Sequence, residues 1–182
     1  MSRGLSDALG PLERVLSRVR RDEVERFEKV LLGARRVFVT GLGRTGLMAR
    51  GFAMRLMHLG RRVYHVGDVI TPAIRRGDLL VICSRTGRSP VLLHYVSMAR
   101  RVGARVAVVT GERGSLVAKR SDATLVLPSE ARRARAGRAP EPPLGSVFEQ
   151  ALLVVLDVVV VHLMDTLGLT AEDLRRIHTT FE

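Results

Sequence analysis

Apolar residues along the chain recur with two different spacings. Short apolar runs, rich in β-branched residues and bounded by Gly, Pro or Asp, are typical of buried strands. We predict five such strands, at residues 37–39, 62–66, 78–83, 105–109 and 123–127. Segments with helical spacing lie between them. Because strands and helices alternate, we expect a parallel sheet that is covered by helices on both faces.

The helical spacing begins ahead of the first strand. Residues 5–32 carry apolar side chains every three or four positions with charges between them, which predicts one helix or a helical pair. Further helices are predicted at 47–59, 90–102, 144–168 and 170–181, with one or two helical turns at 116–120. The fold class is therefore α/β: a doubly wound, five-stranded parallel sheet with an N-terminal helical arm (1–33) and a C-terminal helix pair (144–182).

The segment 128–143 interrupts the alternation of strands and helices. It contains four prolines and four arginines but no large apolar residue, so we expect a surface loop. The whole chain has 182 residues, of which 46% are apolar. That is enough for one full hydrophobic core, and we expect residues 1–182 to form a single domain.

The long C-terminal helix raises the question of a membrane span, because residues 151–161 are nearly all apolar. Asp157 interrupts this run, and His162 and Asp165 follow it. The uninterrupted apolar runs are thus shorter than the roughly 20 residues that a bilayer requires. We expect a buried helix and no membrane association. Its apolar excess further suggests packing against a second subunit.

The formal net charge of +12 suggests nucleic acid as a partner, because a basic surface attracts phosphates. The basic residues, however, are spread along the chain among acidic ones, and all except Lys29 and Lys119 are arginines. Only two Tyr and five Phe are present to stack on bases. We therefore expect no nucleic-acid partner.

The cysteine content and the first residues bear on the compartment. Cys83 is the only cysteine, so no disulfide can form within the chain. The sequence begins MSRGLSDALG, which lacks the apolar core of a secretory signal. Both observations favour the cytoplasm.

Two loops carry candidate chemistry, because ligands of open parallel sheets bind beyond the carboxyl ends of the strands. The first loop, residues 40–46, contains G-x-G-x-x-G between a strand and a helix, the fingerprint of a dinucleotide site. In such a site an acid at the end of the second strand binds the ribose. Here Asp68 comes two residues after that strand, behind Gly67, and no second lobe remains to hold a hydride partner. The dinucleotide site is therefore the weaker interpretation.

The second loop, residues 84–89, fits a phosphate monoester better. Ser84, Thr86 and Ser89 can each donate an O–H group, and Gly87 lets the backbone approach a ligand closely. Ser89 followed by proline is also a favourable helix start, where N–H groups attract anions. The simpler alternative is that Ser89 only caps the helix and the rest is a solvated turn. The loop residues alone leave both open.

Several segments together resemble the sugar isomerase (SIS) domain family, and within it the 6-phospho-3-hexuloisomerases. The resemblance covers nearly the whole chain and rests on TGLGRTGLMARGFAMRLMHLG, VGDVITP, the Ser-x-Ser/Thr-Gly-x-Ser/Thr loop, VTGERGSLVAKRSDATLVLP, LGSVFEQALLVVLD and the terminal RRIHTTFE. It implies a flavodoxin-like fold, a homodimer or homotetramer, and no cofactor. It also implies the interconversion of arabino-3-hexulose 6-phosphate and fructose 6-phosphate through an enediol.

The resemblance implies a phosphate site made from both loops. Its expected residues are Gly43, Arg44 and Thr45 after the first strand and Ser84, Arg85, Thr86 and Ser89 after the third. The common form of the second loop is Ser-Gly-Ser-Gly-Glu-Thr, from which this sequence departs at Arg85 and Arg88. An additional guanidinium can strengthen phosphate binding, so the departures leave the preferred sugar phosphate open. Asp68 and Thr71 are expected to line the sugar pocket.

By the same resemblance, Glu149 is the base that moves a proton between C2 and C3, and His178 is the acid or proton shuttle, supplied by its own or a neighbouring subunit. Both residues also have simpler interpretations. Ser146 and Glu149 have the spacing of a capping box, in which the carboxylate only reaches back to the helix start. His178 borders an apolar helix face, where it can simply pack. The other histidines show no metal-ligand spacing, so no metal site is expected.

Two alternatives to this isomerase remain. One is another sugar-phosphate isomerase. The other is a non-catalytic SIS module that senses sugar phosphates. Regulators of the sensing kind carry a helix-turn-helix domain ahead of the SIS domain, and the roughly 33 residues before the first strand are too few for one. Glu149 and His178 discriminate between an enzyme and a sensor, because a sensor needs no base.

Overall fold

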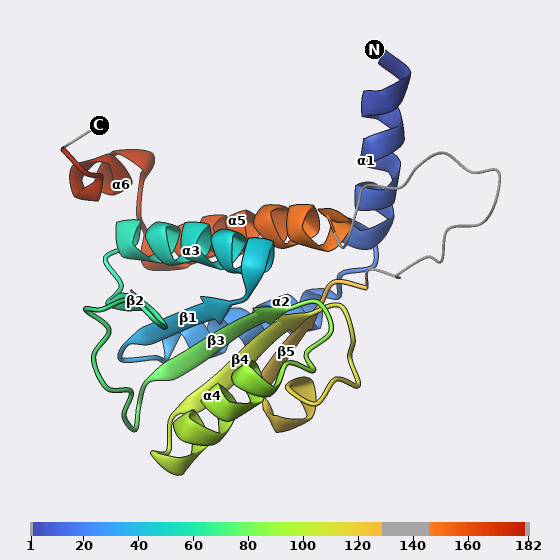
Figure 1. The fold of residues 1–182 in the computed structure, drawn as a ribbon. Helices are drawn as coiled ribbons and strands as arrows, with labels where there is room; N and C mark the ends of the chain where they lie inside the picture. The colour runs from blue at the N-terminus through green and yellow to red at the C-terminus, as the bar shows by residue number, and fades with distance from the viewer. Residues whose placement is uncertain (1, 129–145, 181–182) are drawn as a thin grey trace.

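The computed structural model describes residues 2–128 and 146–180. Its centre is a five-stranded sheet in the order β2-β1-β3-β4-β5, in which all neighbouring strands are parallel (Figure 1). The strands are β1 (Val37–Gly41), β2 (Val63–His65), β3 (Leu79–Ser84), β4 (Arg105–Thr110) and β5 (Ala123–Val126). The predicted α/β class and five-stranded parallel sheet are thus confirmed. The chain order reverses between β1 and β3, so the loops after these two strands flank the position where such sheets bind ligands.

In the described residues the helices follow in the predicted order, with shifted ends. They are α1 (Ser2–Leu16), α2 (Arg21–Leu32), α3 (Gly43–His58), α4 (Pro90–Arg101), a 3-10 helix η1 (Ala118–Arg120), α5 (Ser146–Leu167) and α6 (Ala171–Ile177). The N-terminal segment forms two helices, α1 and α2, so of the two predicted possibilities, one helix or a helical pair, the pair is confirmed. The prediction that the last helix reaches residue 181 was wrong, because the backbone turns extended at His178. The predicted surface loop at 128–143 lies, after Pro128, outside the described residues.

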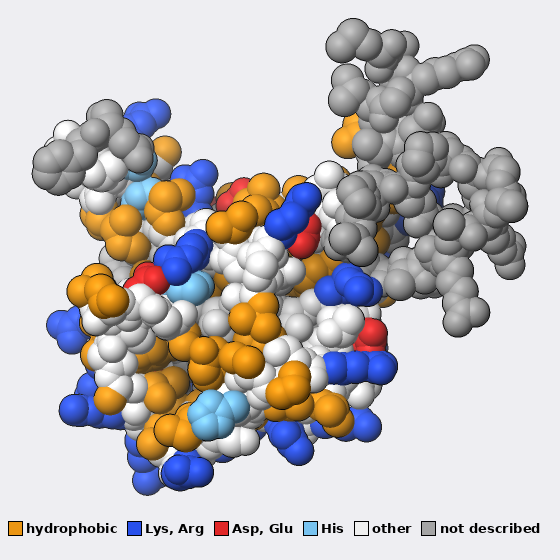
Figure 2. Space-filling model, in the orientation of Figure 1, with side chains coloured by type: hydrophobic (Ala, Val, Ile, Leu, Met, Phe, Trp, Pro, Cys, Tyr) orange, Lys and Arg blue, Asp and Glu red, His pale blue; other side chains and the backbone are white. Residues whose placement is uncertain are grey.

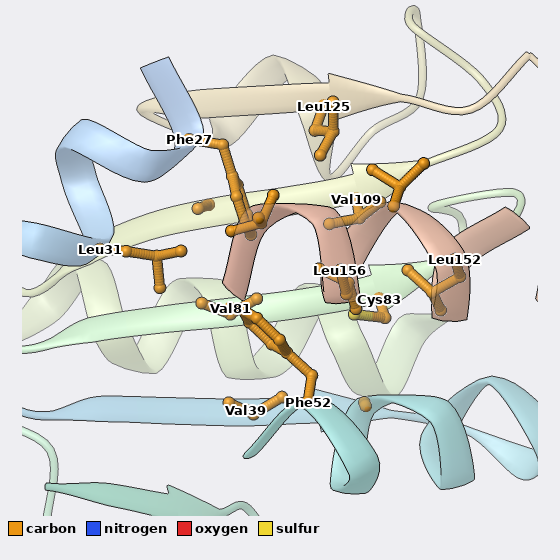
Figure 3. Packing of buried hydrophobic residues seen from close by; sticks show 14 of the residues in the cluster. Phe27, Leu31, Val39, Phe52, Val81, Cys83, Val109, Leu125, Leu152 and Leu156 are labelled. Carbon is orange, nitrogen blue, oxygen red and sulfur yellow. The ribbon is translucent and has the colours of Figure 1, made fainter. Parts of the chain in front are cut away.

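The sheet separates two hydrophobic clusters, because successive strand residues point to opposite faces. On one face, side chains such as Val39, Val81 and Val109 pack with α2, α3 and α5 (Figure 3). On the other face, Phe38 and Leu80 pack with α4 and η1. Helices therefore cover both faces of the sheet, as the continuous apolar runs predict.

Helix α5 is, in the described part of the chain, the one helix that is long and apolar enough to cross a membrane. One of its faces packs on the sheet through residues such as Leu152 and Leu156 (Figure 3). This agrees with the predicted buried helix. Its other face exposes a row of apolar side chains: Leu153, Val154, Val158 and Val161.

Candidate functional site

The loop after β3, residues 84–89 (the β3 loop), leads directly into α4. Ser89 is the N-cap residue and Pro90 the first helical residue, as predicted, but the Ser89 side chain makes no capping hydrogen bond. Its hydroxyl is therefore not used to cap the helix. The Ser84 hydroxyl accepts a hydrogen bond from the Gly87 N–H at 3.1 Å, and Thr86 is half-buried between them. The β3 loop thus presents hydroxyls at a helix N-terminus, where anions bind favourably.

The loop after β4, residues 111–117 (the β4 loop), packs against the β3 loop and forms hydrogen bonds with its backbone. The Gly111 N–H donates to the Arg85 carbonyl at 2.9 Å, and the Val117 N–H donates to the Gly87 carbonyl at 3.1 Å. Gly87 has a φ of +56°, and a Cβ there would lie 2.4 Å from the Ser115 Oγ. Gly87 is thus required both for its backbone conformation and for close contact between the two loops.

The loop after β1, residues 41–46 (the β1 loop), brings strand and helix into close contact. A Cβ on Gly46 would lie 2.6 Å from the Gly41 carbonyl oxygen, so the glycine spacing is explained by packing. Gly43, at a φ of +57°, begins α3, and Thr45 lies half-buried in its first turn. The N-cap position, Leu42, provides no side-chain cap. Because β1 and β3 are parallel neighbours, the β1 loop and the β3 loop lie at the same edge of the sheet, each at the start of a helix.

The carboxylate of Glu149, in the first turn of α5, pairs with the β1 loop. Its side chain is only 10% exposed, and the Arg44 Nε lies 2.7 Å from its Oε2. The N–H of Arg44 is not aligned for a hydrogen bond to this oxygen, so the contact is an ion pair. Leu152, three residues further along α5, packs in the same cluster as Cys83, the residue before the β3 loop (Figure 3). A buried acid thus lies at the carboxyl edge of the sheet, beside the β1 loop.

His178 lies elsewhere in the same chain. Its ring stacks on that of His58, with centroids 5.0 Å apart. His58 is the last residue of α3, whereas Arg44, next to Glu149, is in its first turn. A helical rise of about 1.5 Å per residue separates the two ends by roughly 20 Å. The structure therefore does not bring His178 and Glu149 of one chain together.

Asp68 and Thr71 form a turn after β2 and have partners of their own. Two nitrogens of Arg50 bind the two oxygens of Asp68, at 2.6 and 3.1 Å, and this contact holds the pKa of the carboxyl below its usual range. The Thr71 hydroxyl donates to the His65 carbonyl at 2.6 Å. Asp68 is therefore already occupied by an arginine rather than free for a ribose, which weakens the dinucleotide interpretation further.

His65 also lies at this end of β2, and sequence reasoning assigned it no role. Its ring nitrogens make no hydrogen bond, although Nδ1 lies 3.6 Å from an Asp68 oxygen. Burial, and secondarily the charge of Arg50, lower the pKa of this imidazole. The lowered pKa of His65 favours its neutral form.

Sequence reasoning also missed the β4 loop. Glu112 accepts hydrogen bonds from the Arg88 Nε and Nη2 at 3.2 and 2.7 Å, so the unexplained Arg88 has an acidic partner there. Arg113, the next residue, forms an ion pair with the buried Glu23 of α2. Two signals in the sequence pointed to this loop: the Thr-Gly pair at the end of β4, which repeats the ending of β1, and the segment VTGERGSLVAKRSDATLVLP that carries part of the family resemblance. A loop after the strand next to β3 is the natural candidate for support of the β3 loop.

The described residues thus form an open parallel sheet with two helix-starting loops and a buried acid near its switch point, which is where α/β proteins of this kind have their ligand sites. Residues 30–139 match the SIS domain family, and this match covers more than half of the chain. The chain therefore belongs to the SIS domain family.

Relatives and solved structures extend the similarity beyond that domain. The 3-hexulose-6-phosphate isomerase of Bacillus subtilis is 32% identical over 179 residues, covering 98% of this chain and 97% of that protein. The enzyme of the same name from Mycobacterium gastri is 39% identical over 147 residues, covering 81% and 74%. A Methanococcus jannaschii protein with an inferred function of 3-hexulose-6-phosphate isomerase superposes with a TM-score of 0.81, at 28% identity, covering 97% and 96%.

Proposed function

We propose that the protein is a 6-phospho-3-hexuloisomerase, which interconverts arabino-3-hexulose 6-phosphate and fructose 6-phosphate. Relatives named 3-hexulose-6-phosphate isomerase, at 32% and 39% identity, support this reaction. The observation that carries the proposal is the Glu149 carboxylate, buried at the ligand-binding edge and paired with Arg44 of the β1 loop. A sugar-phosphate sensor has no need of a buried base in this place.

The substrate phosphate binds to the hydroxyls of Ser84, Thr86 and Ser89, with Thr45 of the β1 loop opposite. The N-termini of α3 and α4 add N–H groups and positive dipole ends that favour a dianion. This anchoring holds the sugar carbons in one position. It thereby supplies the orientation on which proton transfer depends.

Glu149 is the base that takes the proton from the carbon next to the carbonyl. The resulting enediol is reprotonated on the neighbouring carbon, so the ketone moves from C3 to C2 with no net oxidation and no cofactor. Arg44 forms an ion pair with Glu149, with 2.7 Å between Nε and Oε2, and polarises a substrate oxygen. His178 transfers protons between the substrate oxygens.

The position of His178 next to His58 supports a site that two subunits complete together. Because roughly 20 Å of helix separates it from Glu149 in one chain, the site uses His178 from a neighbouring subunit. The active form is then a dimer or tetramer in the cytoplasm.

The decisive experiment is an assay in which purified protein converts hexulose 6-phosphate and the fructose 6-phosphate formed is coupled to NADP reduction. Glu149→Gln is expected to lower kcat by about 10²- to 10⁴-fold, because a positioned base contributes that much. Its affinity for fructose 6-phosphate should change little. The matched control is Asp157→Asn, which removes an exposed carboxylate from the same helix and should leave kcat intact.

Three outcomes separate the alternatives. Absence of turnover together with normal sugar-phosphate binding would identify a sensor. Turnover of a different sugar phosphate in preference to hexulose 6-phosphate would indicate another isomerase of this family. Undiminished turnover in Glu149→Gln would reduce Glu149 to a structural residue at the helix start.

A further inference from the structure

Arg88 occupies an unusual place in the β3 loop. It lies between Gly87, which packs against Ser115, and Ser89, the N-cap of α4. Its side chain leaves the β3 loop toward Glu112 of the β4 loop. Because hydrogen bonds join the backbones of these two loops, the ion pair is not needed to hold them together.

The geometry of the Arg88–Glu112 pair differs from that of two other arginine–carboxylate pairs near strand ends. In the Arg36–Asp78 and Arg50–Asp68 pairs, two guanidinium nitrogens bind two carboxylate oxygens. In the pair with Glu112, Nε at 3.2 Å and Nη2 at 2.7 Å share the single oxygen Oε2. The two-oxygen arrangement is the stronger one for an arginine. Arg88 is thus held in a less favourable arrangement than these two.

Water also competes for this pair, because the side chain of Arg88 is 69% exposed and that of Glu112 is 38% exposed. Exposed pairs of this kind contribute little net stability. A phosphate dianion, in contrast, offers several oxygens to the two parallel N–H groups of a guanidinium. An anion bound by the β3 loop would lie beside the residue that carries this guanidinium, within reach of a side-chain rotation.

We propose that Arg88 exchanges its partner on substrate binding: it releases Glu112 and binds the phosphate of the substrate. This inference rests on the proposed phosphate site in the β3 loop. Glu112 is then a competitor that lowers affinity for sugar phosphates, and Arg88 is a specificity-determining residue that favours a doubly charged phosphate group over an uncharged sugar.

The test is titration calorimetry with fructose 6-phosphate, and with inorganic phosphate and fructose as separate probes. Arg88→Gln is expected to weaken fructose 6-phosphate binding about tenfold, the effect of losing a charge-assisted bond. Glu112→Gln is expected to tighten it about threefold, since an exposed competitor is removed. In a protein that already carries Arg88→Gln, adding Glu112→Gln should not tighten binding, because no guanidinium remains for which Glu112 and the phosphate compete.

Two control variants make the result specific. Arg100→Gln removes one positive charge and one exposed ion pair, with Asp122, at the far end of the same helix α4, and should leave affinity unchanged. Arg88→Lys keeps the charge but not the paired N–H groups, so it should restore part of the affinity lost in Arg88→Gln. Thermal unfolding of each variant verifies that the fold is retained.

The outcomes separate this proposal from the one on which it rests. Unchanged affinity in Arg88→Gln would overturn the exchange while leaving the isomerase intact. Weaker binding in Glu112→Gln would also overturn it, because the pair would then only tether the loops. If the wild-type protein binds no sugar phosphate, the proposed function is wrong and the exchange is wrong with it.

Discussion

Gly87 is the residue at which the β3 loop tolerates least change. We predict that Gly87→Ala destabilises the protein, because alanine at a φ of +56° costs about 1–2 kcal/mol and its Cβ would overlap the buried Ser115 side chain. Gly60→Ala is the matched control, since Gly60 has a φ of +72° and open space around it. In urea unfolding, Gly87→Ala should lose about 1–3 kcal/mol more than the control.

A second variant shows whether the extra loss comes from the overlap. Ser115→Gly removes the side chain that the new Cβ would meet, so it should recover part of the stability of Gly87→Ala. Fructose 6-phosphate binding should follow the same order, with the control close to wild type. Equal losses of unfolding free energy in Gly87→Ala and Gly60→Ala would mean that the β3 loop and the β4 loop can move apart to accept the new Cβ without a cost in stability.

At the same scale, sequence patterns indicated where some residues of the candidate site lie in the fold. The hydroxyls of the β3 loop follow one strand directly, so a local pattern was enough to place them. The Arg44–Glu149 pair joins residues far apart in sequence, and no local spacing predicts it. Glu112 escaped attention because its importance depends on β4 lying next to β3, which only the assembled sheet determines.

At the scale of secondary-structure elements, the buried acid Asp78 links the amino ends of β1 and β3 through its bonds to Arg36. Asp78 has no exposed surface and precedes β3 directly. Its oxygens accept hydrogen bonds from Arg36 at 3.0 and 2.6 Å, and from the Arg75 N–H at 2.8 Å. Burial alone would raise the pKa of this carboxyl, but the hydrogen bonds and charge of Arg36, with the Arg75 N–H, lower it below its usual value. The ionised form therefore stabilises the fold.

This linkage predicts how stability depends on pH. A carboxyl with a lowered folded-state pKa contributes stability above its unfolded pKa, about 3.9, and loses it as pH falls through the folded value. Asp78→Asn should cost about 3–5 kcal/mol at pH 7, because it leaves Arg36 without its charge partner. The difference between wild type and variant, measured by urea unfolding, should shrink below pH 4. A difference that stays constant down to pH 2.5 would contradict the assigned role.

The elements themselves were largely predictable, and their ends were not. The five strands are continuous apolar runs, a signal that tertiary packing reinforces. Helix α3 begins at Gly43 instead of the predicted residue 47, and Gly46, which is required for close packing on Gly41, lies within its first turn. Helix α6 ends at Ile177, before the predicted residue 181. Its capping box at Thr170 fixed its start far more clearly than any residue fixed its end.

At the scale of the whole molecule, two features favour association between copies of this chain. Apolar side chains lie over α3 and α5, interrupted by basic ones (Figure 2). Those of Leu47 and Met54 on α3 and Val158 and Val161 on α5 are exposed. Exposed apolar side chains gathered on neighbouring helices are typical of an interface. If Glu149 and His178 act as proposed, their separation in one chain requires a second chain to complete the site.

Subunit complementation tests whether the site is shared. If His178 of one chain serves Glu149 of another, Glu149→Gln and His178→Gln are each inactive, but an oligomer of both contains sites with neither defect. Random mixing into dimers would restore about a quarter of the wild-type sites. The measurement is isomerase activity after the two variants are unfolded and refolded together, with each variant refolded alone as the reference.

The controls decide between the possible causes of a negative result. Val158→Glu, placed in both partners, should abolish the recovery, because a charge on the exposed face of α5 opposes association without disturbing the core. Mixed oligomers that form, as shown by a size-tagged partner, but recover no activity would mean that one chain supplies both residues. That result would require His178 to leave His58 and cross the length of α3. Full activity in His178→Gln alone would instead leave Glu149 and Arg44 to carry out the proton transfer.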